Sequence, residues 1–389
     1  MKILRTLTAG FASLTLTASA FAAGGGKAPA PPEDGWPFEG PLGTFEQDSV
    51  QRGFQVYNEV CSACHGLKLL SYRNLGEKGG PFYNPDYPNA NDNPLVKSFA
   101  AAREVSAIDD NGDEIFVPAK PSDSFVEPYA NAQKAAALNN GAVPPDLSVI
   151  TKARAGGPSY VYRLLKGYPV PSSGKRVTRT VEAFEPLLDE NNQPILGEDG
   201  SPVMVDASYN VTDMVITLDD GHGHTGQLVQ TPNQYYNPYM AGDTSGAWDG
   251  DPRHPPYGGF LAMPPQLLEP DGGEGVDCKA EHKKAKDAIY AAEHPEDHEG
   301  EHVTLSGPAK LAILDETFYS ACSTQVVYSD GTYPSVKQMS YDVAQFLAWA
   351  GDPKQGNRKS LGLPVMIYLL ILCGLLYASY KQIWRKVDH

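Results

Sequence analysis

Basic side chains are scarce in this 389-residue sequence, which has 31 lysines and arginines against 47 aspartates and glutamates and a formal net charge of −16. An acidic surface of this kind disfavours nucleic acid and anionic lipid as partners and favours a basic protein. Cysteine is also scarce, with five residues, and the single Cys-x-x-Cys pair has no second copy to complete a four-cysteine zinc site. No tandem repeat is evident.

The motif Cys61-Ser62-Ala63-Cys64-His65 is the most informative part of the chain. Cys-x-x-Cys-His is the attachment signature of a c-type haem, in which the two cysteines add to the vinyl groups of one porphyrin. A zinc half-site and a thiol-disulfide couple are the alternatives, but neither gives the adjacent histidine a role. The motif predicts one covalently attached haem c, bound through Cys61 and Cys64, with His65 as an iron ligand.

Apolar segments lie near both ends of the chain. Residues 1–22 have a basic start, an apolar stretch and small residues at a cleavage site, which is typical of a secretory signal peptide. Its removal takes the net charge to about −18. Residues 361–380 carry no charge, and a helix of that length, rising 1.5 Å per residue, spans the ~30 Å core of a bilayer.

These segments predict the topology of the chain. We expect a signal peptide, a periplasmic haem domain and a transmembrane anchor with a cytoplasmic tail, over residues 1–22, 23–355 and 356–389 respectively. The cleaved signal places the haem domain outside, so the expected location is the inner membrane of a bacterium, crossed once, with the C-terminus in the cytoplasm.

Helical periodicity surrounds the motif. Asp48 is a candidate N-cap for a helix whose apolar face runs from Val50 to Cys61, and Gly53 beside this face would allow another helix to cross closely. Further helices are predicted over residues 159–166 and 340–350, the latter ended by Gly351. With 38 glycines and 33 prolines elsewhere, the pattern favours a mainly α domain with long loops.

Several co-linear blocks resemble the cytochrome c1 family, the haem subunit of the quinol:cytochrome c oxidoreductase (bc1) complex. They are Arg52-Gly53-Phe54-Gln55-Val56-Tyr57, Tyr72-Arg73-Asn74-Leu75, Asn139-Asn140-Gly141-Ala142-Val143-Pro144-Pro145-Asp146-Leu147-Ser148, Ala153-Arg154-Ala155-Gly156-Gly157, Tyr236-Asn237-Pro238-Tyr239 and Ala262-Met263-Pro264-Pro265. The resemblance implies a mainly α, cytochrome c-like haem domain with long loop insertions and one C-terminal transmembrane helix. It also implies electron transfer from a Rieske iron-sulfur protein to a cytochrome c, beside cytochrome b, in a dimeric membrane complex, with no catalysis by this chain alone.

Attachment spacing does not identify the sixth iron ligand. Met263 is followed by Pro264 and Pro265, whose fixed φ angles stiffen the loop, and the family resemblance falls on the same residue. Met240 is the alternative, with Met204, Met214 and Met339 as further exported methionines. A thioether ligand would raise the reduction potential into a range suited to electron transfer.

Four further site residues are implied by the resemblance. Arg154 corresponds to an arginine that pairs with a haem propionate, and Tyr160 to a second propionate contact. Pro144 and Pro145 correspond to the wall beside the histidine ligand, where a proline carbonyl can accept the Nδ1 proton of His65.

Two segments depart from the family pattern and are predicted as insertions, at about 172–232 and 267–325. The first has alternating polarity that favours β-hairpins. The second contains Cys278, which we expect to form a disulfide with Cys322 because an exported chain meets an oxidising compartment. Zinc binding by histidines is an alternative for both insertions, but Pro295 and interleaved acids favour a solvated segment; the residues are His222, His224, His282, His294, His298 and His302.

Two other functions stay open at this point. One is an independent membrane-anchored monohaem cytochrome that feeds a terminal oxidase. The other is a haem sensor or enzyme with an open sixth position.

Overall fold

A computed structural model describes residues 27–169, 176–187, 189, 193–196, 201–219, 225–230, 233–294 and 304–385. The predicted signal peptide at residues 1–22 lies outside these ranges, as do His222, His224, His298 and His302.

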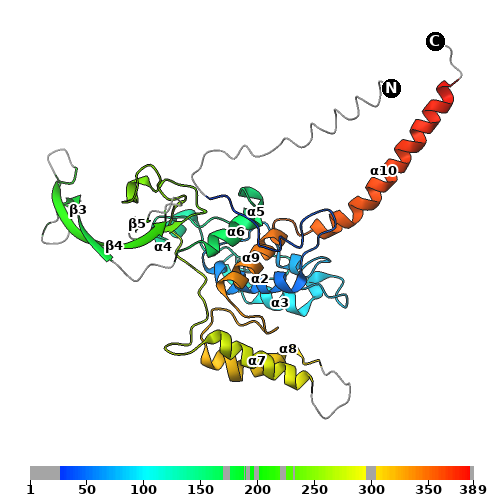
Figure 1. Ribbon diagram of the computed structural model, residues 1–389, viewed down its shortest axis with the longest axis horizontal. Helices are drawn as coiled ribbons and strands as arrows, with labels where there is room; N and C mark the ends of the chain where they lie inside the picture. The colour runs from blue at the N-terminus through cyan, green and yellow to red at the C-terminus, as the bar shows by residue number, and fades with distance from the viewer. Residues whose placement is uncertain are drawn as a thin grey trace.

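The described chain is mainly α, as predicted from the sequence (Figure 1). Its helices are α2 (Gln47–Glu59), α3 (Pro94–Ala101), α4 (Ala132–Leu138), α5 (Ile150–Ala153), α6 (Pro158–Lys166), α7 (Cys278–Glu293), α8 (Gly307–Leu314), α9 (Val336–Ala350) and α10 (Gln355–Trp384). Its strands are β1 (Glu104–Ile108), β2 (Glu114–Pro118), β3 (Arg176–Pro186), β4 (Met204–Asp219), β5 (Thr225–Gln230), β6 (Tyr235–Asn237) and β7 (Gly259–Leu261). The strands form the antiparallel sheets β1-β2, β3-β4-β5 and β6-β7.

The main core, in the domain predicted to hold the haem, forms where α2 crosses α9, and α6 also packs against α9. Gly53 lies at this crossing, because a Cβ there would meet the backbone carbonyl of Asp342 and lie 2.7 Å from Cβ of Phe346. The close crossing expected of Gly53 is therefore confirmed. It allows the apolar faces of both helices to bury their side chains against each other, including Phe54, Tyr57 and Phe346.

A buried ion pair fixes the same crossing. Arg52 Nε lies 3.0 Å from Oδ2 of the fully buried Asp342, while its NH1 atom lies 2.6 Å from Oδ2 of Asp330. Ser49 donates a 2.6 Å hydrogen bond to the other Asp342 oxygen. Burial raises the pKa of the Asp342 carboxyl, and the hydrogen bonds and charge of Arg52 oppose this rise. Since each charge is compensated, α2 and α9 are joined at one register.

Helix boundaries differ from the sequence prediction by a few residues. The helix α2 begins at Gln47 with Glu46 as its N-cap, so Asp48 lies in the first turn and the prediction that it caps the helix is wrong. An acid in the first turn still interacts favourably with the helix dipole. The helix α9 begins at Val336, earlier than predicted, because the Ser335 side chain accepts a hydrogen bond from the Gln338 amide.

The first predicted insertion contains a three-stranded sheet, which confirms the predicted hairpins. Strands β3 and β4 pair from Arg176 with Met214 to Pro186 with Met204, and β4 continues to pair with β5. The ribbon β3-β4 extends away from the α2–α9 core (Figure 1).

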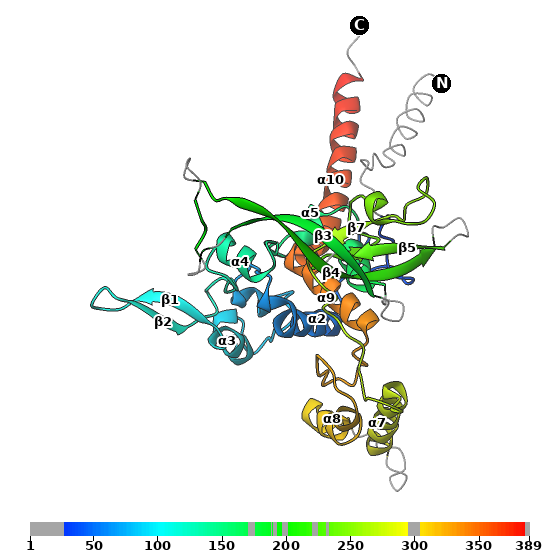
Figure 2. The same cartoon turned by 90° about the vertical axis from the view of Figure 1, so that its left-hand side faces the viewer.

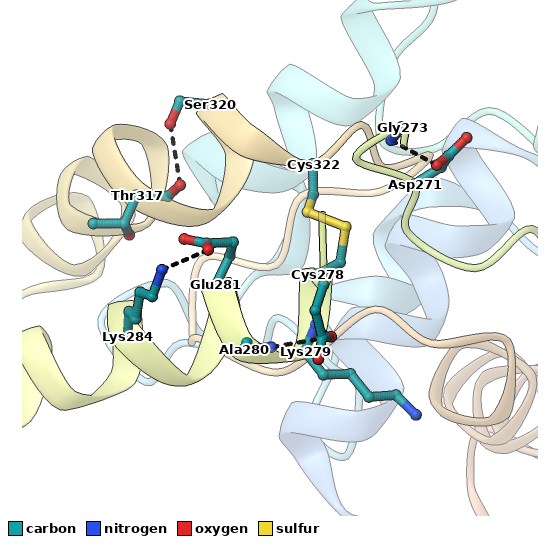
Figure 3. The surroundings of a disulfide bond; sticks show 11 residues. Asp271, Gly273, Cys278, Lys279, Ala280, Glu281, Lys284, Thr317, Ser320 and Cys322 are labelled. Carbon is teal, nitrogen blue, oxygen red and sulfur yellow. Dashed lines mark hydrogen bonds and ion pairs between the residues drawn. A yellow bond between two sulfur atoms is a disulfide. The ribbon is translucent and has the colours of Figure 1, made fainter. Parts of the chain in front are cut away.

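The second predicted insertion contains two helices with a small core of their own. A disulfide joins Cys278, the first residue of α7, to Cys322, with the two Cα atoms 5.9 Å apart (Figure 3). Beneath it, Ala285, Ile289 and Phe318 are buried. His282 connects this core to the haem domain, since its Nε2 atom lies 2.9 Å from the Gly331 carbonyl oxygen.

The last helix, α10, is 30 residues long and apolar enough to cross a membrane, with its apolar side chains exposed along its length. Figure 2 shows it leaving the domain on the side opposite α7 and α8. Near its start, the Lys359 ammonium donates hydrogen bonds to the carbonyl oxygens of Phe38 (2.5 Å) and Gly43 (3.1 Å). The anchor is thereby tied to the segment that precedes α2.

We expect Gly53→Ala to destabilise the domain by about 1–3 kcal/mol, because the added methyl group has no room between the two helices. Denaturant unfolding of the purified full-length chain measures this change. Gly246→Ala is the matched control, since nothing lies within 4 Å of a Cβ built at Gly246. Equal stability of the two variants would contradict the close packing described here.

Candidate functional site

The motif lies directly at the end of α2. After α2, residues Cys61–Ala63 form one 3-10 turn, and the amides of Cys64 and His65 both donate to the Cys61 carbonyl oxygen, at 3.1 and 2.9 Å. Both cysteines are partly exposed free thiols. The turn therefore places two thiols and an imidazole on five consecutive residues just after α2. The close contact at Gly53 sets the orientation of that helix.

His65 is fixed by hydrogen bonds on both its ring and its backbone. Its Nδ1 atom lies 2.8 Å from the carbonyl oxygen of Pro145, and Tyr57 donates a 2.9 Å hydrogen bond to its carbonyl oxygen. Burial lowers the pKa of the imidazole, although the Pro145 carbonyl and Asp146 oppose this. A neutral imidazole that donates from Nδ1 leaves Nε2 with a free lone pair for a metal.

The loop that supplies Pro145 is bonded to the residues that follow the motif. Asp146 accepts from the Lys68 amide at 2.9 Å, Leu147 donates to the Gly66 carbonyl at 2.9 Å, and Ser148 accepts from the Leu69 amide at 3.1 Å. Pro144, predicted to share the wall, is partly buried beside it. Three hydrogen bonds, none of them to the His65 ring, therefore hold the Pro145 carbonyl in its position opposite His65.

The donor set fits a c-type haem better than a thiolate metal site. Burial, with a smaller contribution from Cys64, raises the pKa of the Cys61 thiol to about 12. No group of three or more side chains that could hold a metal ion occurs among the described residues, whereas a thioether needs only one thiol for each bond and carries no charge to bury. The neutral His65 supplies the one ligand that the motif must provide.

Met263 lies two residues after β7, in a loop that the β6-β7 ribbon positions. Asn237, at the end of β6, pairs with Gly259 and donates a 2.8 Å hydrogen bond to the Leu164 carbonyl at the end of α6. Tyr168 donates a 2.9 Å hydrogen bond to the Met263 carbonyl. The Met263 backbone is therefore held by its own strand and by the segment after α6, in addition to the two prolines that follow it.

The other methionines have different surroundings. The Met240 sulfur lies 3.9 Å from the Tyr160 hydroxyl, which can donate to it. Met339 is 1% exposed within the α2–α9 core, and Met204 is exposed on β4. The side chain of Met214 lies outside the described structure, and Met366 belongs to α10.

Arg154 and Tyr160 are neighbours on either side of the turn that begins α6. The Arg154 guanidinium carbon lies 5.9 Å from the centroid of the Tyr160 ring. Burial raises the pKa of Tyr160, and the charge of Arg154 opposes this. No carboxylate among the described residues lies within salt-bridge distance of the exposed Arg154, so its donors face solvent.

The predicted residues thus form two groups. Cys61, Cys64, His65 and Pro145 make one group. In the other, Tyr160 contacts Met240 and Arg154, and Tyr168, two residues after α6, bonds to the Met263 carbonyl. Within the described ranges, no hydrogen bond or ring contact links the groups directly, but α5 connects them along the chain.

Three tyrosines that support the site were not predicted for that role. Tyr57 was assigned to the apolar face of the predicted helix and to a family-like block, and Tyr168 was given no role. The third, Tyr129, has its pKa raised chiefly by a hydrogen-bonding contact with Cys64, and it accepts a 2.9 Å bond from Asn139. Their hydroxyl groups act across 8 to 95 positions of sequence, which no local pattern reveals.

Histidine clusters suited to a metal ion do not occur in the part of the chain that the structure describes. His282 is buried against Phe318 and Tyr333 and bonded to Gly331, and His294 bonds to the Tyr290 carbonyl at the end of α7.

Comparison with known proteins agrees with this geometry. The chain matches the Cytochrome C1 family model over residues 36–289 and 319–387. The internal gap in this match, residues 290–318, lies within the second predicted insertion. Three relatives illustrate the similarity. "Cytochrome c1" of Rhodospirillum rubrum is 30% identical over 355 residues, which cover 91% of this chain and 87% of the relative.

A mitochondrial relative from Kluyveromyces lactis, "Cytochrome c1, heme protein", is 42% identical over 356 residues, with 92% of this chain and 77% of the relative covered. "Cytochrome b/c1" of Bradyrhizobium diazoefficiens is 28% identical over 358 residues, covering 91% of this chain and 35% of that longer protein.

Proposed function

The chain belongs to the cytochrome c1 family, and from this premise we propose that it carries electrons as the haem subunit of a quinol:cytochrome c oxidoreductase. The observation that supports this most is the Cys-x-x-Cys-His turn at the end of α2, with Nδ1 of His65 bonded to the Pro145 carbonyl. Nothing in this role requires the chain to transform a substrate.

Each residue of the turn has one task in this proposal. Cys61 and Cys64 would hold one haem c through thioether bonds, and Nε2 of His65 would bind its iron while Pro145 holds the tautomer. Met263 would supply the other iron ligand. When bound, the haem supplies a one-electron iron couple, whose potential His/Met ligation raises.

Arg154 and Tyr160 have a different task, the compensation of propionate charge. The exposed guanidinium of Arg154 lies over the Tyr160 ring, and a carboxylate placed beside both would gain charge-assisted hydrogen bonds. Met240, whose sulfur already lies against the Tyr160 hydroxyl, then lines the propionate site and is not an iron ligand.

We further propose the partners and the topology. The electron arrives from a Rieske iron-sulfur protein and leaves to a basic cytochrome c, and cytochrome b is a neighbour in a dimeric complex. The name of the Bradyrhizobium relative, which joins b and c1, supports the cytochrome b partner. The helix α10 is the single anchor in a bacterial inner membrane, with the haem domain in the periplasm and the C-terminus in the cytoplasm.

Purification of the assembly from its own membranes tests this function. We expect this chain to migrate with covalent haem in denaturing gels and to co-purify with a b-type cytochrome and an iron-sulfur protein. Isolation of the chain alone would indicate an independent monohaem cytochrome instead. Carbon monoxide binding to the reduced native protein would indicate an open sixth position, and therefore a sensor or an enzyme.

Met263→Leu should leave haem attached through Cys61 and Cys64, but it should abolish the methionine-to-iron absorption band and lower the reduction potential. Optical redox titration of membranes measures both effects. Met240→Leu is the matched control and should keep the band. A reversed result, with the band lost only from the Met240 variant, would transfer the ligand role to Met240.

Association with a basic cytochrome c should depend strongly on salt, because the net charge of the chain is −16 before signal removal. The second-order rate should fall steeply between 0.01 M and 0.1 M salt, as the Debye length shortens from about 30 Å to about 10 Å. Stopped-flow mixing of the reduced complex with oxidised cytochrome c measures this rate. A rate independent of salt would favour apolar docking or a tethered partner.

A further inference from the structure

A half-buried arginine lies beside the haem-attachment turn. Arg103 follows α3 and precedes β1, 38 positions after His65 in the sequence. Its NH2 atom lies 2.9 Å from Oγ of Ser62, the residue that follows Cys61 in the motif. The same atom lies 3.3 Å from Oδ1 of Asn58 and 3.5 Å from its carbonyl oxygen, so its strongest bond is to Ser62.

Ser62 connects Arg103 to the end of α2. Its hydroxyl donates a 2.7 Å hydrogen bond to the Asn58 carbonyl, and it accepts from Arg103 at the same oxygen. The last carbonyls of a helix have no partner within the helix, and a cation placed there interacts favourably with the helix dipole. Arg103 and Ser62 together therefore close the end of α2 where the chain turns into Cys61–Ala63.

The arginine is itself held from both sides. Its amide donates to the Ala100 carbonyl at 3.0 Å, and its carbonyl accepts from the Ala119 amide at 2.8 Å, at the base of the β1-β2 hairpin. Across the described ranges, no carboxylate forms a salt bridge with its guanidinium. A charge that is fixed in place and not neutralised nearby acts electrostatically on any group bound to Cys61 and Cys64.

We propose that Arg103 is a positioning residue of the haem site that also raises the reduction potential of the iron. This inference rests on the proposed covalent haem at Cys61 and Cys64. The bond to Ser62 holds the turn between the two thiols in the conformation in which both can attach. The guanidinium charge favours the ferrous form, because reduction removes one positive charge from an iron held at this turn.

Three single variants of the full-length chain separate the bond from the charge. Arg103→Gln removes the charge and shortens the side chain, so that its bond to Ser62 is lost, whereas Arg103→Lys keeps the charge without the planar fork. Ser62→Ala keeps the charge but removes the oxygen that accepts from Arg103 and donates to the Asn58 carbonyl. The readouts are covalent haem per polypeptide in denaturing gels and the midpoint potential from optical titration of membranes. A role limited to capping α2 would not change the potential.

We expect Arg103→Gln to carry less covalent haem and to titrate at a lower potential than the unaltered chain. Arg103→Lys and Ser62→Ala should keep the potential, and Ser62→Ala should reduce attachment. The double variant R103Q/S62A should lose less attachment than the sum of the two single losses, because both changes break the Arg103–Ser62 bond. If Arg103→Gln accumulates poorly, the Lys and Ala variants still test the bond and the charge.

An unchanged potential and full haem loading in Arg103→Gln would overturn the proposal. A potential lowered equally in Arg103→Lys would overturn the charge effect. These outcomes differ from failure of the proposed function, in which the unaltered chain itself would carry no covalent haem.

Discussion

The contact between α2 and α9 at Gly53 is the constraint on which the other features depend. A backbone-to-backbone approach at this position allows Arg52 to reach Asp342, and the pair then excludes other registers of the two helices. Removal of one partner would leave a buried charge without compensation, at a cost of about 3–5 kcal/mol. Since α2 ends at the Cys-x-x-Cys-His turn and α9 leads into α10, this crossing sets the relation between the haem site and the anchor.

Local patterns predicted the parts of the fold that depend on local chemistry. The spacing of Cys61, Cys64 and His65, the helices around residues 159–166 and 340–350, and the apolar span of α10 all follow from short stretches of sequence. The prediction of a cap at Asp48 failed because α2 already begins at Gln47, with Glu46 as its N-cap and no side-chain cap hydrogen bond, so that Asp48 lies inside the helix. The predicted site residues likewise lie in or beside the sequence blocks that resemble the cytochrome c1 family.

Contacts between distant segments could not be predicted in the same way. The bond from Tyr168 to Met263 and the bond from His282 to Gly331 join residues 95 and 49 positions apart. The disulfide between Cys278 and Cys322 was predicted and is confirmed. The rest of the second predicted insertion was expected to be a solvated segment, yet α7 and α8 build a small core that docks through His282. Arg103 was missed because an arginine before a β-hairpin has no distinguishing pattern until the fold places it beside Ser62.

Lys359 restricts how the start of α10 can move relative to the rest of the domain. Its ammonium holds the carbonyls of Phe38 and Gly43, so the first turns of α10 are fastened to the segment that precedes α2. If α10 spans the membrane as proposed, these two bonds restrict rotation of the domain about α10. Under the proposed function, the haem then has little freedom to move, and the proteins that deliver or collect electrons have to approach it.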